Sequence, residues 1–543
     1  MRKSRVGVIL LLLTTASLLG ELQPQPALSL LILNARVFTG RAEKPWEEAI
    51  AISGDRIVAT GSSEALKSRA TPGTRVVDAN GKLVVAGLND AHVHVGASPQ
   101  VTRLEGPPAM EQDPSLQEIL TRLKVAVGKA PADGWISGEI GARVLDDPAA
   151  TRFAVDAVAS NHPVILTSWT GHGSLVNTIA LRRLNLRDDE PDPPGGEFVR
   201  VPGKTTISGI AHEYAGNLIW QRIAAAANEQ DLVATLQRGA RTLARYGITS
   251  VQVMATGQSP DVLSKGIATA GVPLRWHLID FPFQRMEDWR PPATRPSSGP
   301  MVKTAGTKWI LDGTPIERLM FLRQPFEDRS STRGRLNFPP ASLNSFLRSA
   351  LAAREQPMFH AVGDAAIDAV LDALQASGGE SWRALRPRVE HGDMLEPRQF
   401  DRMKRFGVVL VQNPAHFMVA ETMKLRLGAR AGRVTLLKSA IAAGIPVALG
   451  SDGPLNPYLN MMFAITNANN PAEAMTREQV VAAYTSGSAY AEHAESEKGT
   501  IAPGKLADLA ILSQDIFTVP TERLPATESI LTVVGGRIVH EAN

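Results

Sequence analysis

The stretch "GLNDAHVHVGAS", residues 87–98, places two histidines two positions apart, directly after an aliphatic run that reads as a buried strand. Residues i and i+2 of a β-strand point to the same side, so His92 and His94 can direct both imidazoles at one point. Imidazole is a common ligand of divalent metals. A pair of core or surface histidines is the plainer interpretation of these two residues taken alone. The position of the pair, between a strand and a loop of small residues, favours a metal site.

Seven further short apolar runs follow, and helical patterns such as 228–246 and 342–355 lie between them. The runs cover residues 247–254, 272–280, 307–313, 356–364, 386–393, 407–413 and 445–453. Together with 81–94 they give eight strand-then-helix units. This order predicts an α/β protein, a (β/α)8 TIM-like barrel over residues 86–498. Residues from about 97 to 225 are then a long, irregular insertion after the first strand, rich in Pro and Gly.

The two ends of the chain share another pattern. Residues 30–85 and 499–543 consist of short β-branched runs broken by Gly, Asn or Asp, which is typical of strands and turns. Because similar β-rich segments enclose the long middle, we expect them to form one small β-sandwich domain built from both termini.

The first residues carry the features of a secretory signal. Arg2, Lys3 and Arg5 form a basic start, residues 6–20 are apolar, and small residues follow at 27 and 29. We therefore predict a signal peptide over residues 1–29 and export to the periplasm or the medium. The apolar run is shorter than the ~20 residues of a membrane span, so no stable span is expected after cleavage. An uncleaved membrane anchor is the alternative.

The composition excludes several classes of function. The net charge of the 543 residues is only +3, and Lys and Arg are dispersed, which argues against nucleic acid as a partner. The chain has no cysteine, so disulfides, thiolate metal ligands and a cysteine nucleophile are excluded. A small-molecule substrate is the expected partner. The oligomeric state stays open, and a homo-oligomer is compatible with the sequence.

Active sites of such barrels lie at the C-terminal ends of the strands, and polar residues recur at those positions here. Each has an ordinary interpretation alone: a solvated lysine, a core histidine or a turn aspartate. Their joint occurrence, in barrel order, favours one site. They are His92, His94, Lys308, Asp312, His360, Glu390, His391 and Asp452.

Several longer segments resemble the amidohydrolase superfamily, in the branch that contains the N-substituted formamide deformylases. The segments are "GLNDAHVHVG", "GHGSLVNTIAL" (171–181), "KWILDG" (308–313), "FHAVGDAAID" (359–368), "RVEHGDML" (388–395), "ALGSDGP" (448–454) and "GTIAPGKLADLAIL" (499–512). The resemblance covers nearly the whole mature chain. It implies a metal-dependent (β/α)8 barrel with a β-sandwich made by both termini.

The resemblance also implies the ligands of two divalent metal ions: His92, His94, Lys308, His360, His391 and Asp452. The first two histidines and the aspartate would hold one ion, and the other two histidines the second. Lys308 matches the lysine that many relatives carbamylate and use to bridge both ions. Zinc is the expected metal, with manganese, iron and nickel as alternatives.

Further roles follow from the same resemblance. Asp452 would also carry a proton from the attacking water to the leaving nitrogen, and His172 would donate to the carbonyl oxygen. Glu390 would orient a ligand, or simply form a salt bridge. Candidate pocket walls, which core packing would explain equally, are Trp169, Trp220 and Trp309, and His416 is placed where it could touch substrate.

Some positions depart from the branch. An acid is usual in the strand 247–254, where this chain has Gln252 and Met254, and the segments around 200–213 and 312–320 also differ. We expect these positions to line the substrate pocket, so they bear on the substrate and not on the metals.

The sequence therefore predicts a metal-dependent hydrolase of carbon–nitrogen bonds other than peptide bonds, acting on an amide, formamide or cyclic amide. Alternatives on the same fold are hydrolysis of an ester, lactone or phosphoester, or a deaminase with one metal. The segment "HAVGDAAID" lacks the glutamate usual in such deaminases. An alternative of another class is a non-catalytic binding protein, which would be expected to lose some of the six ligands.

Overall fold

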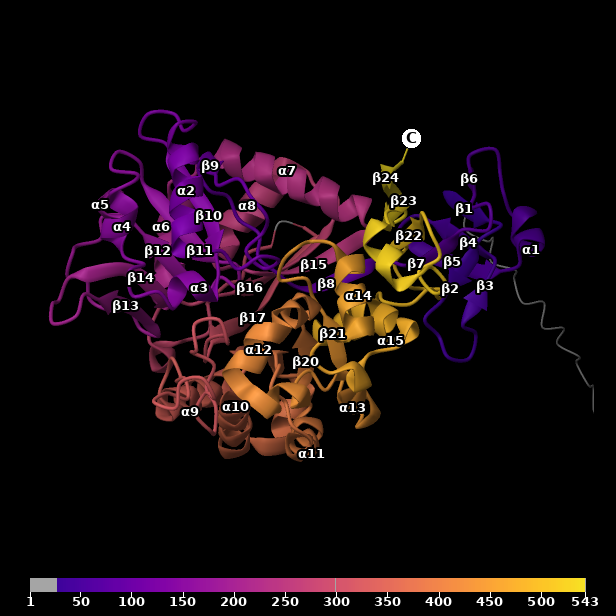
Figure 1. Cartoon of the computed structure of the whole chain (residues 1–543). Helices are drawn as coiled ribbons and strands as arrows, with labels where there is room; N and C mark the ends of the chain where they lie inside the picture. The colour runs from indigo at the N-terminus through magenta and orange to yellow at the C-terminus, as the bar shows by residue number, and fades with distance from the viewer. Residues whose placement is uncertain (1–26, 298, 543) are drawn as a thin grey trace, which may run out of the picture.

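The computed structural model describes residues 27–297 and 299–542, and Figure 1 shows their arrangement. The predicted signal peptide lies outside the described residues, except for its last three. Within the described part of the chain, no helix combines the length and apolar character needed to cross a bilayer.

Eight parallel strands form the centre of the molecule, each paired with the next in chain order. They are β8 (Leu88–Val93), β15 (Ile248–Met254), β16 (Arg275–Asp280), β17 (Val302–Ile310), β18 (Pro357–Ala361), β19 (Arg388–His391), β20 (Val409–Gln412) and β21 (Val447–Leu449). Seven of them fall within the runs that the sequence predicted, and β17 starts five residues before its predicted run of 307–313 and ends inside it. The fold is thus the expected (β/α)8 barrel.

The last strand meets the first at the end that carries the polar residues. The backbone N–H of Asp452 donates to the carbonyl oxygen of His92 at 2.8 Å, and the N–H of Ser451 donates to the Asp90 carboxylate at 2.8 Å. The approach requires glycine at position 450, because a Cβ there would lie 2.5 Å from the His92 nitrogen. This closure brings residues 92 and 452 together although they are far apart in sequence.

Helices surround the barrel. They include α7 (Glu229–Arg245), α8 (Pro260–Ala270), α9 (Pro340–Ala352), α10 (Asp364–Ser377), α11 (Pro397–Phe406), α12 (Ala420–Leu427), α13 (Leu437–Ala442) and α14 (Pro457–Thr466), followed by α15 (Arg477–Ala482) and α16 (Ser488–Ala491). The helix predicted at 228–246 is α7. Asn228 and Asp231 form its capping box, and Leu232, Leu236 and Leu243 bury one face against the barrel.

The insertion between β8 and β15 is an ordered layer and not the irregular segment that the sequence suggested. One mixed sheet runs in the order β13–β14–β12–β11–β10–β9. Its elements are β9 (Val101–Arg103), α2 (Leu116–Val127), β10 (Trp135–Ile140), α3 (Ala142–Leu145), α4 (Arg152–Asp156), β11 (Val164–Ser168), β12 (Gly173–Val176), α5 (Thr178–Arg183), β13 (Gly196–Arg200), β14 (Ile207–Glu213) and α6 (Tyr214–Ala225). Two apolar clusters of its own stabilise this layer.

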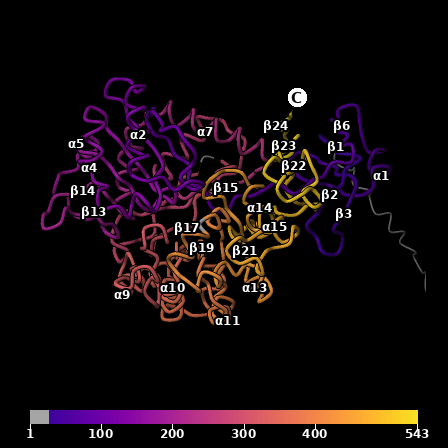
Figure 2. The backbone as a smooth tube through the Cα atoms, in the orientation of Figure 1, coloured from indigo at the N-terminus to yellow at the C-terminus, as the bar shows by residue number. Residues whose placement is uncertain are grey.

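The chain ends form the expected β-sandwich, and Figure 2 shows the first and last segments side by side. Its sheets run β5–β4–β1–β6 and β24–β23–β22–β7–β2–β3. The elements are β1 (Leu30–Leu33), β2 (Arg36–Phe38), β3 (Trp46–Glu47), β4 (Ala49–Ser53), β5 (Arg56–Gly61), α1 (Ser63–Lys67), β6 (Arg75–Asp78), β7 (Leu83–Ala86), β22 (Leu509–Leu512), β23 (Ser529–Val534) and β24 (Arg537–Glu541). β7 pairs with β22, and only Gly87 separates it from β8. The boundaries between the domains stay a prediction.

Candidate metal centre and active site

A cavity of about 660 Å³ lies at the C-terminal ends of the barrel strands, between these ends and the sheet of the insertion. All seven residues predicted for the site line it: His92, His94, His172, Lys308, His360, His391 and Asp452. They come from β8, β17, β18, β19, the loop after β21 and the insertion. The structure therefore brings the predicted residues into one place.

Asp452 lies at the centre of this group. Its Oδ1 is 3.2 Å from His94 Nε2 and 3.7 Å from His92 Nε2. A φ of 53° at Asp452 turns the backbone so that the carboxylate reaches these rings. Burial opposes a charge on Asp452, but the surrounding histidines hold the pKa of this carboxyl well below its ordinary value.

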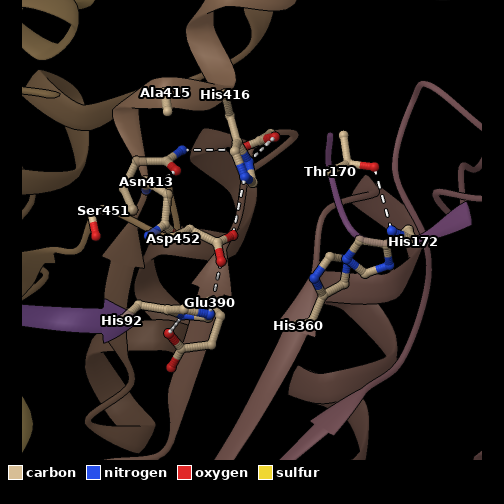
Figure 3. Close-up of polar contacts among 12 residues, drawn as sticks. His92, Thr170, His172, His360, Glu390, Asn413, Ala415, His416, Ser451 and Asp452 are labelled. Atoms are coloured by element: carbon tan, nitrogen blue, oxygen red, sulfur yellow. Dashed lines mark hydrogen bonds and ion pairs between the residues drawn. The ribbon is translucent and has the colours of Figure 1, made fainter. Parts of the chain in front are cut away.

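A second pair of rings extends the cluster on the other side of Asp452. The rings of His391 and His416 stack with their centroids 4.7 Å apart, and His416 Nε2 is 3.5 Å from Asp452 Oδ2. Figure 3 shows Asp452 between His92 and His416. The other ring nitrogen of His416 lies 3.3 Å from Asp393 Oδ2. Although burial favours the neutral ring, the two carboxylates raise the pKa of His416 to about 10.

Lys308 and His360 lie on the neighbouring strands β17 and β18, two positions apart in register. Burial lowers the pKa of Lys308 to about 8, against the opposing effect of the Glu390 and Asp452 carboxylates. The His360 ring lies 4.5 Å from the His391 ring, centroid to centroid. Burial lowers the pKa of both imidazoles well below the ordinary value, so both are neutral and keep a lone pair for a metal.

His172 reaches the cavity from the insertion, at the start of β12. Its ring centroid is 4.3 Å from that of His360, and its Nδ1 is 2.9 Å from Glu213 Oε2. Figure 3 shows the two rings side by side. Burial would lower the pKa of His172, but Glu213 outweighs it and the pKa is raised. Glu213, the last residue of β14, has a φ of 55° and is fully buried.

His92 is held by a buried ionic network that includes Glu390 and Arg388. His92 Nδ1 is 2.6 Å from Glu390 Oε2, and Arg388 Nε donates to Glu390 Oε1 at 2.6 Å. Arg388 also donates to Gln252 Oε1 at 2.6 Å and to the Ala91 carbonyl oxygen at 2.7 Å. Burial would raise the pKa of Glu390, but Arg388 and His92 lower it to about 2. The network fixes the His92 ring, as expected for a group that orients a metal ligand.

The amidohydrolase family model matches residues 75–540. The chain belongs to the amidohydrolase family. This amidohydrolase is 28% identical to an N-substituted formamide deformylase of Arthrobacter pascens over 548 aligned residues, which cover 94% of the chain and 98% of the relative. Membership confirms the predicted class of enzyme, a metal-dependent hydrolase of carbon–nitrogen bonds.

Solved structures agree on the fold. An uncharacterized metal-dependent hydrolase of Pyrococcus horikoshii OT3 superposes with a TM-score of 0.68 at 21% identity, over 91% of this chain and 99% of the other. An adenosine deaminase of Xanthomonas campestris with bound zinc gives 0.51 at 15% identity, over 95% and 94% of the two chains. At these identities the likeness shows the fold alone.

The donor atoms of this amidohydrolase suit the divalent ions that its family uses. The set includes the neutral imidazoles of His360 and His391, a charged carboxylate and a lysine of lowered pKa, which are nitrogen and oxygen donors. His391 Nδ1 is buried without a hydrogen-bond partner among the described residues, which is costly for a polar atom that binds nothing. Two groups have donor atoms that all lie within 4.8 Å of one another: His92, His94 and Asp452, and His391, His416 and Asp452.

Some predicted roles of this amidohydrolase need correction. Trp169 and Trp220 line the cavity, but Trp309 is fully buried where β17 packs against α9. Gln252 and Met254 were expected in the substrate pocket and are both buried away from it. Gln252 contacts Arg388 and Asn89 instead, away from the cavity lining. Trp309 alternates with Lys308 and therefore faces away from it, and sequence alone did not give the side.

Asp312 does not line the cavity, although its Oδ1 lies 3.8 Å from Nε2 of the predicted ligand His360. Its carboxylate accepts backbone N–H bonds from Phe321, Val362 and Gly363 at 2.8–2.9 Å, and so fixes the loops above β17 and β18. No role was predicted for Asp393 or Glu213. Asp393 follows His391 by two residues, a spacing that could have pointed to it, whereas Glu213 had no signal because it meets His172 only through the sheet of the insertion.

Proposed function

We propose that this amidohydrolase uses two divalent ions to cleave a C–N bond in a small amide, formamide or cyclic amide. The observation that carries the proposal is the position of Asp452 between two groups of imidazoles, beside Lys308 and in a cavity of suitable size. Cavities of roughly 300–1,000 Å³ are typical for small molecules.

The chain offers a ligand for each position of such a centre. His92, His94 and Asp452 would hold the first ion, and His360 and His391 the second. Lys308, carbamylated on Nζ, would be a further ligand. Its lowered pKa supports the modification, because only the neutral amine reacts with carbon dioxide to give a carbamate and a proton. Zinc is the proposed metal. Such ions, when bound, lower the pKa of water and polarise a carbonyl group.

Asp452 is the proposed carrier of the proton. Its carboxylate is charged, so it can accept a proton from the attacking water and return it to the leaving nitrogen. His416 contacts Oδ2 of Asp452 and is itself held by Asp393. We assign His416 the role of positioning this carboxylate.

His172 is the proposed donor to the carbonyl oxygen. Its Nδ1 is engaged by Glu213, and its Nε2 has no hydrogen-bond partner among the described residues. Because Glu213 is fixed by Asn337 as well, at 3.2 Å, the imidazole is held in one orientation before substrate arrives. A donor fixed in advance is the arrangement that stabilises a developing oxyanion.

Export of the mature chain is a further part of the proposal. Leu28 is 4% exposed, and the Ser29 N–H donates to the Ile52 carbonyl oxygen at 2.9 Å. Cleavage after residue 29 would remove these contacts, so we propose that the signal peptide is cut before Ala27. Mass spectrometry of the exported protein tests this, and an intact residue 1–26 segment on cytosolic protein would contradict it.

Metal content per chain tests the catalytic proposal. The protein should be purified without refolding, with bicarbonate present, and assayed for metals and for hydrolysis of an amide panel. We expect two ions per chain and amide turnover, with fewer ions in Lys308→Ala. Lys303→Ala is the matched control, since Lys303 lies on the same strand but donates to the Glu492 carbonyl oxygen, away from the cavity.

Other outcomes would contradict the proposal in different ways. One ion per chain that is indifferent to Lys308 would indicate a mononuclear enzyme, such as a deaminase. Two ions with turnover of esters, lactones or phosphoesters but not amides would show that the enzyme hydrolyses another type of bond. No ion after addition of zinc or manganese would indicate a non-catalytic binding protein.

A further inference from the structure

The sheet of the insertion presents one face to the cavity. Alternate residues of three neighbouring parallel strands line it: Val101 and Arg103 of β9, Trp135, Ser137 and Glu139 of β10, and Ile165 and Thr167 of β11. We call this face the roof. Arg103 pairs with Ser137 across the sheet, and Ser137 with Ile165, so these side chains form one row over the cavity.

Two arginines of the roof region have no counter-ion in the protein. Arg103 and Arg122, the latter on α2, both line the cavity. Among the described residues, neither guanidinium lies within 4.0 Å of a carboxylate. The hydrogen bond of Arg122 goes to the Pro107 carbonyl oxygen at 3.5 Å, a long contact. Both groups are therefore available to a ligand, and arginine binds carboxylates with two parallel hydrogen bonds.

The surroundings of these arginines limit the kind of anion. Glu139 lies on the same face and is the one acid of the cavity lining other than Asp452, so the two arginines and this carboxylate leave a single net positive charge on this side of the cavity. Trp135, Ile165, Trp220 and Ile223 supply apolar surface beside the charged groups. A ligand that satisfies this cavity combines an apolar body with a single negative charge.

We propose that the substrates are amides that carry a carboxylate on the part remote from the scissile bond, and that Arg103, with Arg122, binds that carboxylate. This inference rests on the proposed function, because it assigns the reacting amide to the metal centre and the carboxylate to the roof. The apolar residues between them would hold the linking aryl or alkyl group. Arg103 is then a specificity-determining residue.

A matched pair of probes tests the inference by binding. Metal-loaded enzyme is titrated calorimetrically with 4-acetamidobenzoate and with neutral 4-acetamidobenzamide, which differ only in the remote group. We expect the carboxylate to bind about tenfold more tightly or better, the usual gain from a hydrogen-bonded charge. Arg103→Gln should abolish this preference, Arg103→Lys should keep part of it, and Arg122→Gln should reduce it.

Arg143→Gln is the control, because Arg143 is an exposed arginine of the insertion that does not line the cavity. Equal affinity for the two probes in the unmodified enzyme would overturn the inference. So would a preference that survives Arg103→Gln and Arg122→Gln together, since the carboxylate would then be bound at the metals. Product release from the same probes is measured separately: a roof-dependent preference without hydrolysis would contradict the proposed function and leave the anion site intact.

Discussion

The two sides of the cavity differ in how their polar groups are paired. We call the side formed by His92, His94, His391, His416 and Asp452 the floor, and it lies opposite the roof. On the floor, Asp452 contacts three imidazoles, and Glu390 is joined to both His92 and Arg388. On the roof, the guanidinium groups of Arg103 and Arg122 have no carboxylate partner among the described residues, and the buried Thr167 hydroxyl has no hydrogen bond there. The comparison teaches that the charged groups of the floor have their partners before substrate binds, whereas the arginines of the roof would obtain a counter-ion only from the substrate.

Removing the charge at the centre of the floor should have the largest effect. We expect Asp452→Asn to lower kcat by ~10²–10⁴-fold, because an amide cannot carry the proton. Steady-state kinetics on any amide that the enzyme turns over measures this. Asp372→Asn, at an exposed aspartate of α10, is the control. A kcat within tenfold of the unmodified enzyme would remove Asp452 from the reaction and weaken the contrast between floor and roof.

The network below the floor should control metal affinity. Arg388→Met leaves Glu390 buried without its cation and frees the His92 ring, so we expect zinc affinity to fall by ~10–100-fold. Competition with a chelator measures it, and circular dichroism checks that the variant is folded. Arg386→Met serves as control, since Arg386 is paired with Glu495 away from the cavity. Unchanged affinity in a folded Arg388→Met protein would show that the network only stabilises the barrel.

The buried charges of the barrel should also make it sensitive to acid. Burial opposes the charge of Glu492, but Lys498 at 2.7 Å and His277 lower its pKa. A carboxyl with a lowered folded pKa stabilises the protein above its unfolded pKa of ~4.3, and this contribution is lost as pH falls below about 5. Thermal unfolding should therefore shift less between about pH 5 and about pH 2 in Glu492→Gln. An identical shift in both proteins would refute this.

A change on the roof should have the smallest effect, confined to substrate binding. We expect Thr167→Val to raise KM by ~2–10-fold, the worth of one neutral hydrogen bond, with kcat and metal content unchanged. A drop in kcat at constant KM would instead show that the roof takes part in the chemical step. That result would break the division between the two regions.

The same division explains what could be predicted from the sequence. The floor lies at the ends of strands, and a strand with its terminal histidine or aspartate is a local pattern, so His92, His360 and Asp452 were found. Their convergence followed from the barrel rule. His416 and Asp393 lie in the loops just beyond strands, where chain order gives no direction, and their contacts with Asp452 and each other emerged only from the structure.

The roof was not predictable in this way. Its strands are short, and β10 and β11 alternate buried and cavity-facing residues within a segment full of Gly and Pro. Arg103 has no neighbour in sequence that marks it as a ligand-binding residue. Its position follows from parallel pairing with β10, whose partner strand β11 lies some 30 residues further along the chain.

One feature of the fold bears on how the enzyme matures. The strand that enters the barrel with His92 and His94 continues, through Gly87, from β7, and β7 is held by β22 near the end of the chain. During synthesis, β8 therefore lacks the contact with the segment after β21, and β7 lacks β22, until most of the polypeptide has been made. We expect metal loading to be a late event that follows release from the ribosome. If the chain is exported as we propose, the ions available where it folds would then decide which metal the enzyme carries.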